Sequence, residues 1–231
     1  MIIPAILEDT FEDIEKNLRI IEEVSPVVQI DIIDGSMYKD KSFLDINKLG
    51  NLNSKSDVTI HLMVNDPGVF VKKKGIFIPA SKSKIKGVST IITQLIPNAT
   101  LENFIKISKD LGYKVGLSIN ADQDNSLLDS FIKDIDLVQF MGVIPGRQGN
   151  EFIPKVLDKI KDFKNRYPAM KTQIDGGVNE ATLPLVLETG VDNIVVGSAI
   201  FNSEYPKKKF LEFSSVLEKR NTAHGSGIYN K

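Results

Sequence analysis

Three polar side chains close three apolar, β-branched runs of the sequence, and their types suit acid–base or metal chemistry. Asp31 and His61 lie near the ends of two such runs, and Asp175 ends a third. Two carboxylates and an imidazole that converge can bind a divalent cation, or can act as acid and base on a carbon next to a carbonyl. A single Asp at a strand end is more often a cap or a loop anchor. Three such residues on three strands favour a functional site.

Glycines follow the last two apolar runs, where parallel barrels usually bind phosphate. Gly176 and Gly177 come after the first of these runs, and Gly197 and Ser198 come after the second. Backbone N–H groups in such loops are free to face an anion. Tight strand-to-helix turns also need glycine, which explains any one of these residues alone. The two loops together favour a phosphate site.

The pattern of the whole chain predicts a scaffold that brings these residues together. Short β-branched runs alternate with longer amphipathic segments from end to end. In residues 11–24, apolar side chains recur at steps of three to four residues, and Thr10 is available as an N-cap. We predict strands at residues 2–7, 27–33, 58–64, 88–95, 114–119, 137–143, 172–175 and 193–196.

Eight strands, each followed by a helix, predict an all-parallel sheet that closes into a (β/α)8 TIM barrel. An open, doubly wound sheet is the alternative, and it would leave two edge strands to protect. Alternate residues of a strand share a face, so if Gln29 points inward, Asp31 projects into the barrel mouth. We expect residues 1–220 to form one barrel domain and residues 221–231 to form a disordered tail.

Composition narrows the classes of partner and compartment. The formal net charge is −1, so no global field attracts nucleic acid or an anionic membrane. Glu8 and Asp9 interrupt the apolar run that a signal peptide would need, and no stretch approaches a membrane span, so we expect a cytoplasmic protein. The sequence has no cysteine, which excludes disulfides and thiolate metal sites. The lysine-rich residues 71–86 fit a solvated insertion better than a phosphate-handling loop.

The ordered set of motifs resembles the ribulose-phosphate 3-epimerase family from Ile3 to about Phe201. Residues 29–35 resemble that family's His-x-Asp-x-Met-Asp-Gly element, and residues 3–7 and 116–120 resemble its first and fifth strands. Three motifs match without change: His61-Leu62-Met63-Val64, Asp175-Gly176-Gly177-Val178 and Gly197-Ser198-Ala199.

This resemblance implies a proton transfer that converts D-ribulose 5-phosphate to D-xylulose 5-phosphate. By position, Asp31 and Asp175 would be the acid and base at C3. A divalent metal, usually zinc, iron or manganese, would be held by Asp31, His61 and Asp175. The resemblance also implies a set of substrate or phosphate contacts, with Arg147 a charged addition in the loop after the sixth strand: His61, Met63, Met141, Gly146, Arg147, Gly149, Gly176, Gly177, Gly197 and Ser198.

The sequence departs from the family pattern inside the predicted site. Gln29 stands where the family has a metal-binding His, and an amide is a poorer zinc ligand than imidazole. Ala5 replaces a usual Ser, Ile33 a Met, and Gln94 a His near the end of the fourth strand. The loop at residues 146–150 also differs. These changes leave open whether the metal is bound and whether the protein is active.

Three functions remain open from the sequence. The first is an active epimerase, of ribulose 5-phosphate or of another ketose phosphate such as allulose 6-phosphate. The second is a phosphosugar-binding relative that no longer catalyses. The third is a lyase resembling hexulose-phosphate synthases, but the segment from Asp31 to Asp34 lacks the lysine of their Asp-x-Lys-x-x-Asp motif. Both carboxylates of the acid–base pair are present, which favours the epimerase. A homo-oligomer is left open.

Overall fold

The strands of the chain form a closed parallel barrel. The computed structural model describes residues 1–231 except 50, 69, 71–86, 97–98, 147–148 and 226–231. The order around the barrel is β1 to β8, and β8 pairs with β1 to close it. The open-sheet alternative is therefore wrong and the (β/α)8 barrel is confirmed. The strands are β1 Ile2–Ile6, β2 Val27–Ile33, β3 Asp57–Met63, β4 Val88–Gln94, β5 Lys114–Ile119, β6 Leu137–Met141, β7 Lys171–Asp175 and β8 Asn193–Val196.

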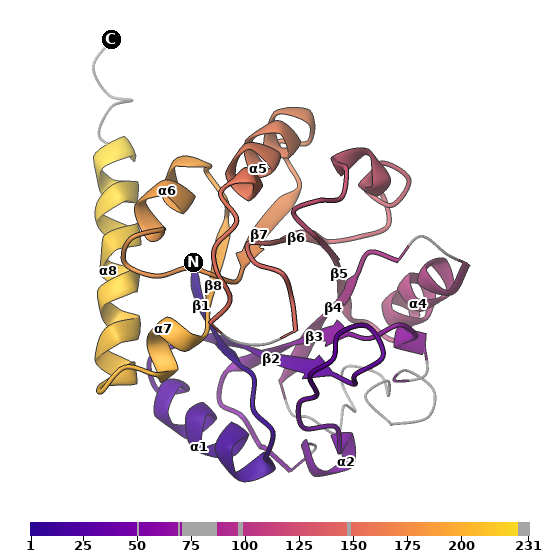
Figure 1. The fold of residues 1–231 in the computed structure, drawn as a ribbon, viewed down its shortest axis with the longest axis horizontal. Helices are drawn as coiled ribbons and strands as arrows, with labels where there is room; N and C mark the ends of the chain where they lie inside the picture. Colours follow the sequence, from indigo (N-terminus) through magenta and orange to yellow (C-terminus); the bar gives the residue numbers. More distant parts are fainter. Residues whose placement is uncertain (50, 69, 71–86, 97–98, 147–148, 226–231) are drawn as a thin grey trace.

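The helices surround the barrel and cover its outer face (Figure 1). Helix α1 shows why: Phe11, Ile14, Leu18 and Ile21 are its buried residues, at the spacing of one helical face. The Thr10 hydroxyl accepts a hydrogen bond from the Asp13 N–H at 3.1 Å, so the predicted N-cap is confirmed. The α-helices are α1 Phe11–Ile21, α2 Ile46–Leu49, α4 Ala99–Asp110, α5 Lys155–Arg166, α6 Leu183–Glu188, α7 Ser198–Phe201 and α8 Pro206–Gly225.

The connection after β5 differs from the repeating pattern that we predicted. A single 3₁₀ turn, η2 (Asn125–Leu128), stands where an α-helix was expected. The Asp124 side chain accepts a hydrogen bond from the Ser126 N–H at 2.8 Å, and this local bond favours a turn over a continued helix.

The C-terminal boundary also differs from the prediction. Helix α8 continues to Gly225, five residues into the segment for which the sequence predicts a disordered tail. The physical reason is that Gly225 is the first glycine or proline after Pro206, so nothing earlier stops the helix. The end of the tail and the whole lysine-rich segment, residues 71–86, lie outside the described residues. Among the helices that the structure describes, none is long and apolar enough to cross a membrane.

Candidate active site at the barrel mouth

A pocket opens at the C-terminal ends of the strands, where barrels of this type carry their sites. Its cavity volume is about 60 Å³, and it opens to solvent at its mouth. Its lining includes most of the residues predicted from the sequence: Asp31, Met63, Met141, Gly146, Gly149, Asp175, Gly176, Gly177, Gly197 and Ser198. His61 is fully buried and is not part of this lining. Arg147 lies outside the described residues.

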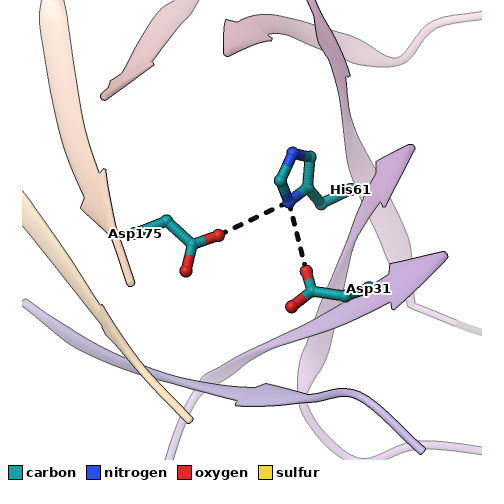
Figure 2. A group of neighbouring side chains, drawn as sticks. All are labelled: Asp31, His61 and Asp175. Atoms are coloured by element: carbon teal, nitrogen blue, oxygen red, sulfur yellow. Dashed lines mark hydrogen bonds and ion pairs between the residues drawn. The ribbon is translucent and has the colours of Figure 1, made fainter. Parts of the chain in front are cut away.

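Asp31, His61 and Asp175 come together at the centre of the barrel (Figure 2). Strand register explains two of them, because Asp31 and His61 are paired residues of β2 and β3. Asp175 arrives from β7 on the other side. The His61 Nδ1 lies 3.2 Å from Asp31 Oδ1 and 3.4 Å from Asp175 Oδ2. The predicted convergence of these three residues is confirmed as geometry.

Burial and charge make this cluster unlike ordinary surface carboxylates. Burial raises the pKa of Asp31, and the nearby charge of Asp175 raises it further. Burial alone would lower the pKa of His61, but hydrogen bonds to Asp175 and Asp31 outweigh it and raise that pKa to about 9. The imidazole is held between two acidic groups.

Amide side chains surround the cluster from below. Gln29 Nε2 donates to Asp31 Oδ1 at 2.8 Å and to Asp175 Oδ2 at 2.7 Å. Gln139 Nε2 also donates to Asp175 Oδ2, at 3.0 Å. On the far side of the imidazole, Gln94 Nε2 lies 2.9 Å from His61 Nε2. Gln29, Gln139 and His61 have no solvent exposure and Gln94 has 2%, so these contacts form in a dry interior where they are strong.

The three ligand atoms of Asp31, His61 and Asp175 fit a small cation. One atom from each residue lies within 4.8 Å of the others, and all three residues are buried. Two carboxylates and one imidazole are a suitable donor set for zinc, iron or manganese. The Gln29 side chain turns its N–H group, not its oxygen, toward both carboxylates. Three residues therefore offer ligands to a cation. Gln29, in the fourth position, offers none in this orientation, because its N–H group faces the carboxylates.

The glycine loops after β7 and β8 form one wall of the pocket. Gly176 and Gly177 have φ angles of +99° and +72°, which non-glycine residues rarely adopt. A Cβ on Gly177 would lie 2.9 Å from the Phe152 ring. These two glycines are thus needed for the backbone path, and the same path brings their backbone to the pocket beside Gly197 and Ser198.

Two methionines and a tyrosine shape the rest of the mouth. Met63 and Met141 each have 3% exposure and place their side chains against the pocket, as predicted. Tyr38 was not predicted from the sequence. Its Cβ lies 3.2 Å from where a Cβ on Gly146 would stand, so the loop after β2 meets the loop after β6. No pattern in the sequence signals this contact between two loops.

Sequence reasoning also missed Gln139 and Gln173, although a signal for them exists. Each stands two residues before a predicted site residue, Met141 or Asp175, and so shares its inward face. Gln29 has the same relation to Asp31. The alternation that located Gln29 would have located both of the others.

Comparison with known proteins agrees with the motifs. The model of the ribulose-phosphate 3 epimerase family matches residues 1–201. A ribulose-phosphate 3-epimerase of Bacillus subtilis (strain 168) is 28% identical over 222 residues, covering 90% of this chain and 95% of the relative. The enzyme of the same name from Escherichia coli (strain K12) is 27% identical over 226 residues, covering 95% and 96%.

Solved structures of similar shape support the fold alone. The 3-hexulose-6-phosphate synthase from Salmonella typhimurium has a TM-score of 0.69 at 15% identity, covering 94% of this chain and 98% of its own. A tryptophan synthase complex from Pyrococcus furiosus has a TM-score of 0.68 at 16% identity, covering 93% and 97%. The family match spans most of the sequence and the closed barrel carries the expected pocket, so this chain belongs to the ribulose-phosphate 3-epimerase family.

Proposed function

We propose that this protein is an epimerase of a ketose phosphate that interconverts D-ribulose 5-phosphate and D-xylulose 5-phosphate. The observation that carries the proposal is the pair of carboxylates, Asp31 and Asp175, which line one pocket and lie around one imidazole. Family membership and the names of the relatives support the same reaction.

The proposed chemistry is an exchange of one proton at C3 of the sugar. An ionised carboxylate removes the C3 proton, the C–H electron pair forms a C2–C3 double bond, and the C2 carbonyl oxygen takes the negative charge. The second carboxyl group then returns a proton to C3 on the opposite face, and the charge collapses back to a carbonyl. The pair must therefore hold one proton between them. The burial and mutual charge that raise the pKa of Asp31 favour that state.

Other residues bind and shield the substrate in this proposal. Met63 and Met141 present apolar side chains to the pocket and exclude water from the reacting carbon. The backbone of Gly176, Gly177, Gly197 and Ser198 holds the phosphate, a position that barrels of this type use repeatedly. Gly146, Gly149 and Arg147 complete the phosphate side in the same proposal.

Asp31, His61 and Asp175 are the residues that would hold a divalent metal. When bound, such a cation supplies electrostatic stabilisation of the negative charge that develops on the sugar oxygens. The imidazole of His61 orients the two carboxylates through its contacts at 3.2 and 3.4 Å.

The test combines metal analysis of the purified protein with an assay of ribulose 5-phosphate epimerisation, before and after Gln29→His. We expect substoichiometric metal in the parent, because it lacks one imidazole ligand. We expect both occupancy and rate to rise in Gln29→His, since imidazole is the better zinc ligand.

The second candidate is a phosphosugar-binding relative that does not catalyse. The presence of Gln29 in place of a ligand His is the observation that favours it. A Gln29→His variant that binds zinc fully, yet epimerises neither pentulose nor hexulose phosphates, would select this candidate over the enzyme.

A further inference from the structure

A third buried amide lies directly beneath the two that contact the carboxylates. Gln173 has 2% exposure, and its Nε2 donates to Gln29 Oε1 at 2.9 Å and to Gln139 Oε1 at 2.7 Å. The same two residues then donate through their own Nε2 atoms to Asp31 and Asp175. Each hydrogen bond of this amide series is donated in the same direction, from Gln173 deep in the barrel toward the carboxylates at its mouth.

The direction is fixed by the chemistry of the two ends. Asp31 Oδ1 and Asp175 Oδ2 both accept hydrogen bonds here, and a carboxylate oxygen that carries no proton can only accept, so each selects the N–H end of the neighbouring amide. The oxygen ends of Gln29 and Gln139 then need donors. Gln173 Nε2 has two hydrogens and donates one to each of these oxygens. Rotating Gln29 by half a turn would place oxygen against two carboxylate oxygens and N–H against N–H. Both contacts are repulsive, and both lie in the dry interior where unmet hydrogen bonds are costly.

We propose that Gln173 is a positioning residue that turns the N–H groups of Gln29 and Gln139 toward the carboxylates and so opposes cation binding between Asp31 and Asp175. The carboxylate oxygens that lie next to His61, Asp31 Oδ1 and Asp175 Oδ2, already accept these amide hydrogens. Gln29 Nε2 bridges the two carboxylates, so its hydrogens lie where a cation would be shared. The amides thus hold the pair together by hydrogen bonds. The effect of this arrangement on catalysis rests on the proposed function.

The substitution Gln173→Glu tests the direction of the hydrogen bonds in this amide series. Glutamate has the same shape, but its ionised carboxylate only accepts, so it would draw the N–H groups of Gln29 and Gln139 downward. Their oxygens would then face the centre and add two hard ligands to Asp31 and Asp175. We expect the affinity for Mn²⁺, measured by electron paramagnetic resonance titration, to rise by about tenfold or more over the parent protein.

Gln94→Glu is the matched control for added charge. Gln94 is also buried. Its hydrogen bonds go to His61 and Ser118 rather than to Gln29 or Gln139. It adds the same negative charge to the same interior without reversing the amides. We expect its gain in Mn²⁺ affinity to be clearly smaller than that of Gln173→Glu. An equal gain would mean that charge alone is responsible and would overturn the proposal.

Gln173→Met keeps the proposal testable if the glutamate variant does not fold. Methionine removes both donors at similar volume and frees the two amides to rotate. We expect Mn²⁺ affinity to rise above that of the parent, by less than in Gln173→Glu. Tight, stoichiometric Mn²⁺ binding by the parent, unchanged in either Gln173 variant, would overturn the proposal. These measurements need no substrate, so they succeed or fail separately from the epimerase assay.

Discussion

The two ends of the barrel each hold a partly or fully buried carboxylate in a hydrogen-bonded cluster, yet the clusters have opposite character. At the C-terminal end, the pKa of Asp31 is raised, first by burial and then by the charge of Asp175. At the N-terminal end, burial acts in the same direction on Asp192, but hydrogen bonds from Thr172 and Lys164 outweigh it and lower its pKa to about 2.

The partners explain the difference. Asp192, just before β8, accepts hydrogen bonds from the Thr172 N–H at 2.9 Å and from the Thr172 hydroxyl at 2.8 Å. Lys164 and Lys171 lie 3.1 and 3.3 Å from its oxygens. This carboxylate ties the starts of β7 and β8 together and is stabilised as the anion. At the mouth, two acids face one imidazole and neutral amides. The base of the barrel is arranged for stability, and the mouth carries the two acids of the proposed proton exchange.

The largest expected effect comes from Asp175→Asn at the mouth. The amide keeps the shape but cannot exchange the proton, so kcat for epimerisation should fall by roughly 10²–10⁴-fold. The thermal midpoint should stay close to that of the parent. Steady-state kinetics and thermal unfolding measure the two quantities. A variant that keeps most of its activity would remove Asp175 from the mechanism.

The same exchange at the base, Asp192→Asn, should have the opposite outcome. Loss of the charge weakens the contacts with Lys164 and Lys171, and we expect the free energy of unfolding to fall by about 1–2 kcal/mol, with allowance for the partial exposure of this group. The kcat should not change. Denaturant unfolding measures the first quantity. An Asp192→Asn variant that is as stable as the parent but inactive would contradict the assignment of a stabilising role to the base and a catalytic role to the mouth.

Acid should remove the stabilising charge of Asp192 at the base of the barrel. Asp192 has a folded pKa of about 2, below its ordinary value of 3.8. Its contribution to stability is therefore present above pH 4 and is lost as the pH falls through about 2. In an acid titration of unfolding, Asp192→Asn should lose less stability than the parent between these limits. Parallel curves for the two proteins would show that Asp192 is not stabilised as the anion.

The smallest effect that we expect separates two glycines within the mouth. Gly177 and Gly149 have similar φ angles, +72° and +79°, so alanine is strained at both. At Gly177 the new Cβ would meet Phe152 at 2.9 Å, whereas at Gly149 no atom of the described residues lies within 4 Å. Gly177→Ala should therefore raise KM for the sugar phosphate several-fold more than Gly149→Ala. Equal KM values would argue against phosphate binding at the β7 loop.

The barrel and its central residues were predictable because each depends on local patterns. β-branched runs gave the strands, and period-two alternation placed Asp31 inward beside Gln29. The same alternation places Gln139 and Gln173 on the inward face. The hydrogen bonds of Gln173 to Gln29 and Gln139 also depend on strand register across the barrel, which one sequence does not provide. The contact of Tyr38 with Gly146 depends on how two loops meet. The 3₁₀ turn after β5 depends on a side-chain hydrogen bond from Asp124 that competes with helix formation.

The most direct test of the two-carboxylate account is solvent exchange at C3 of ribulose 5-phosphate in D₂O, followed by proton NMR. The account predicts that the parent protein converts ribulose 5-phosphate to xylulose 5-phosphate with deuterium at C3, and that Asp175→Asn loses this conversion while Asp192→Asn keeps it. If the parent, loaded with metal, produces neither deuterium at C3 nor xylulose 5-phosphate, Asp31 and Asp175 are not an acid–base pair for this substrate.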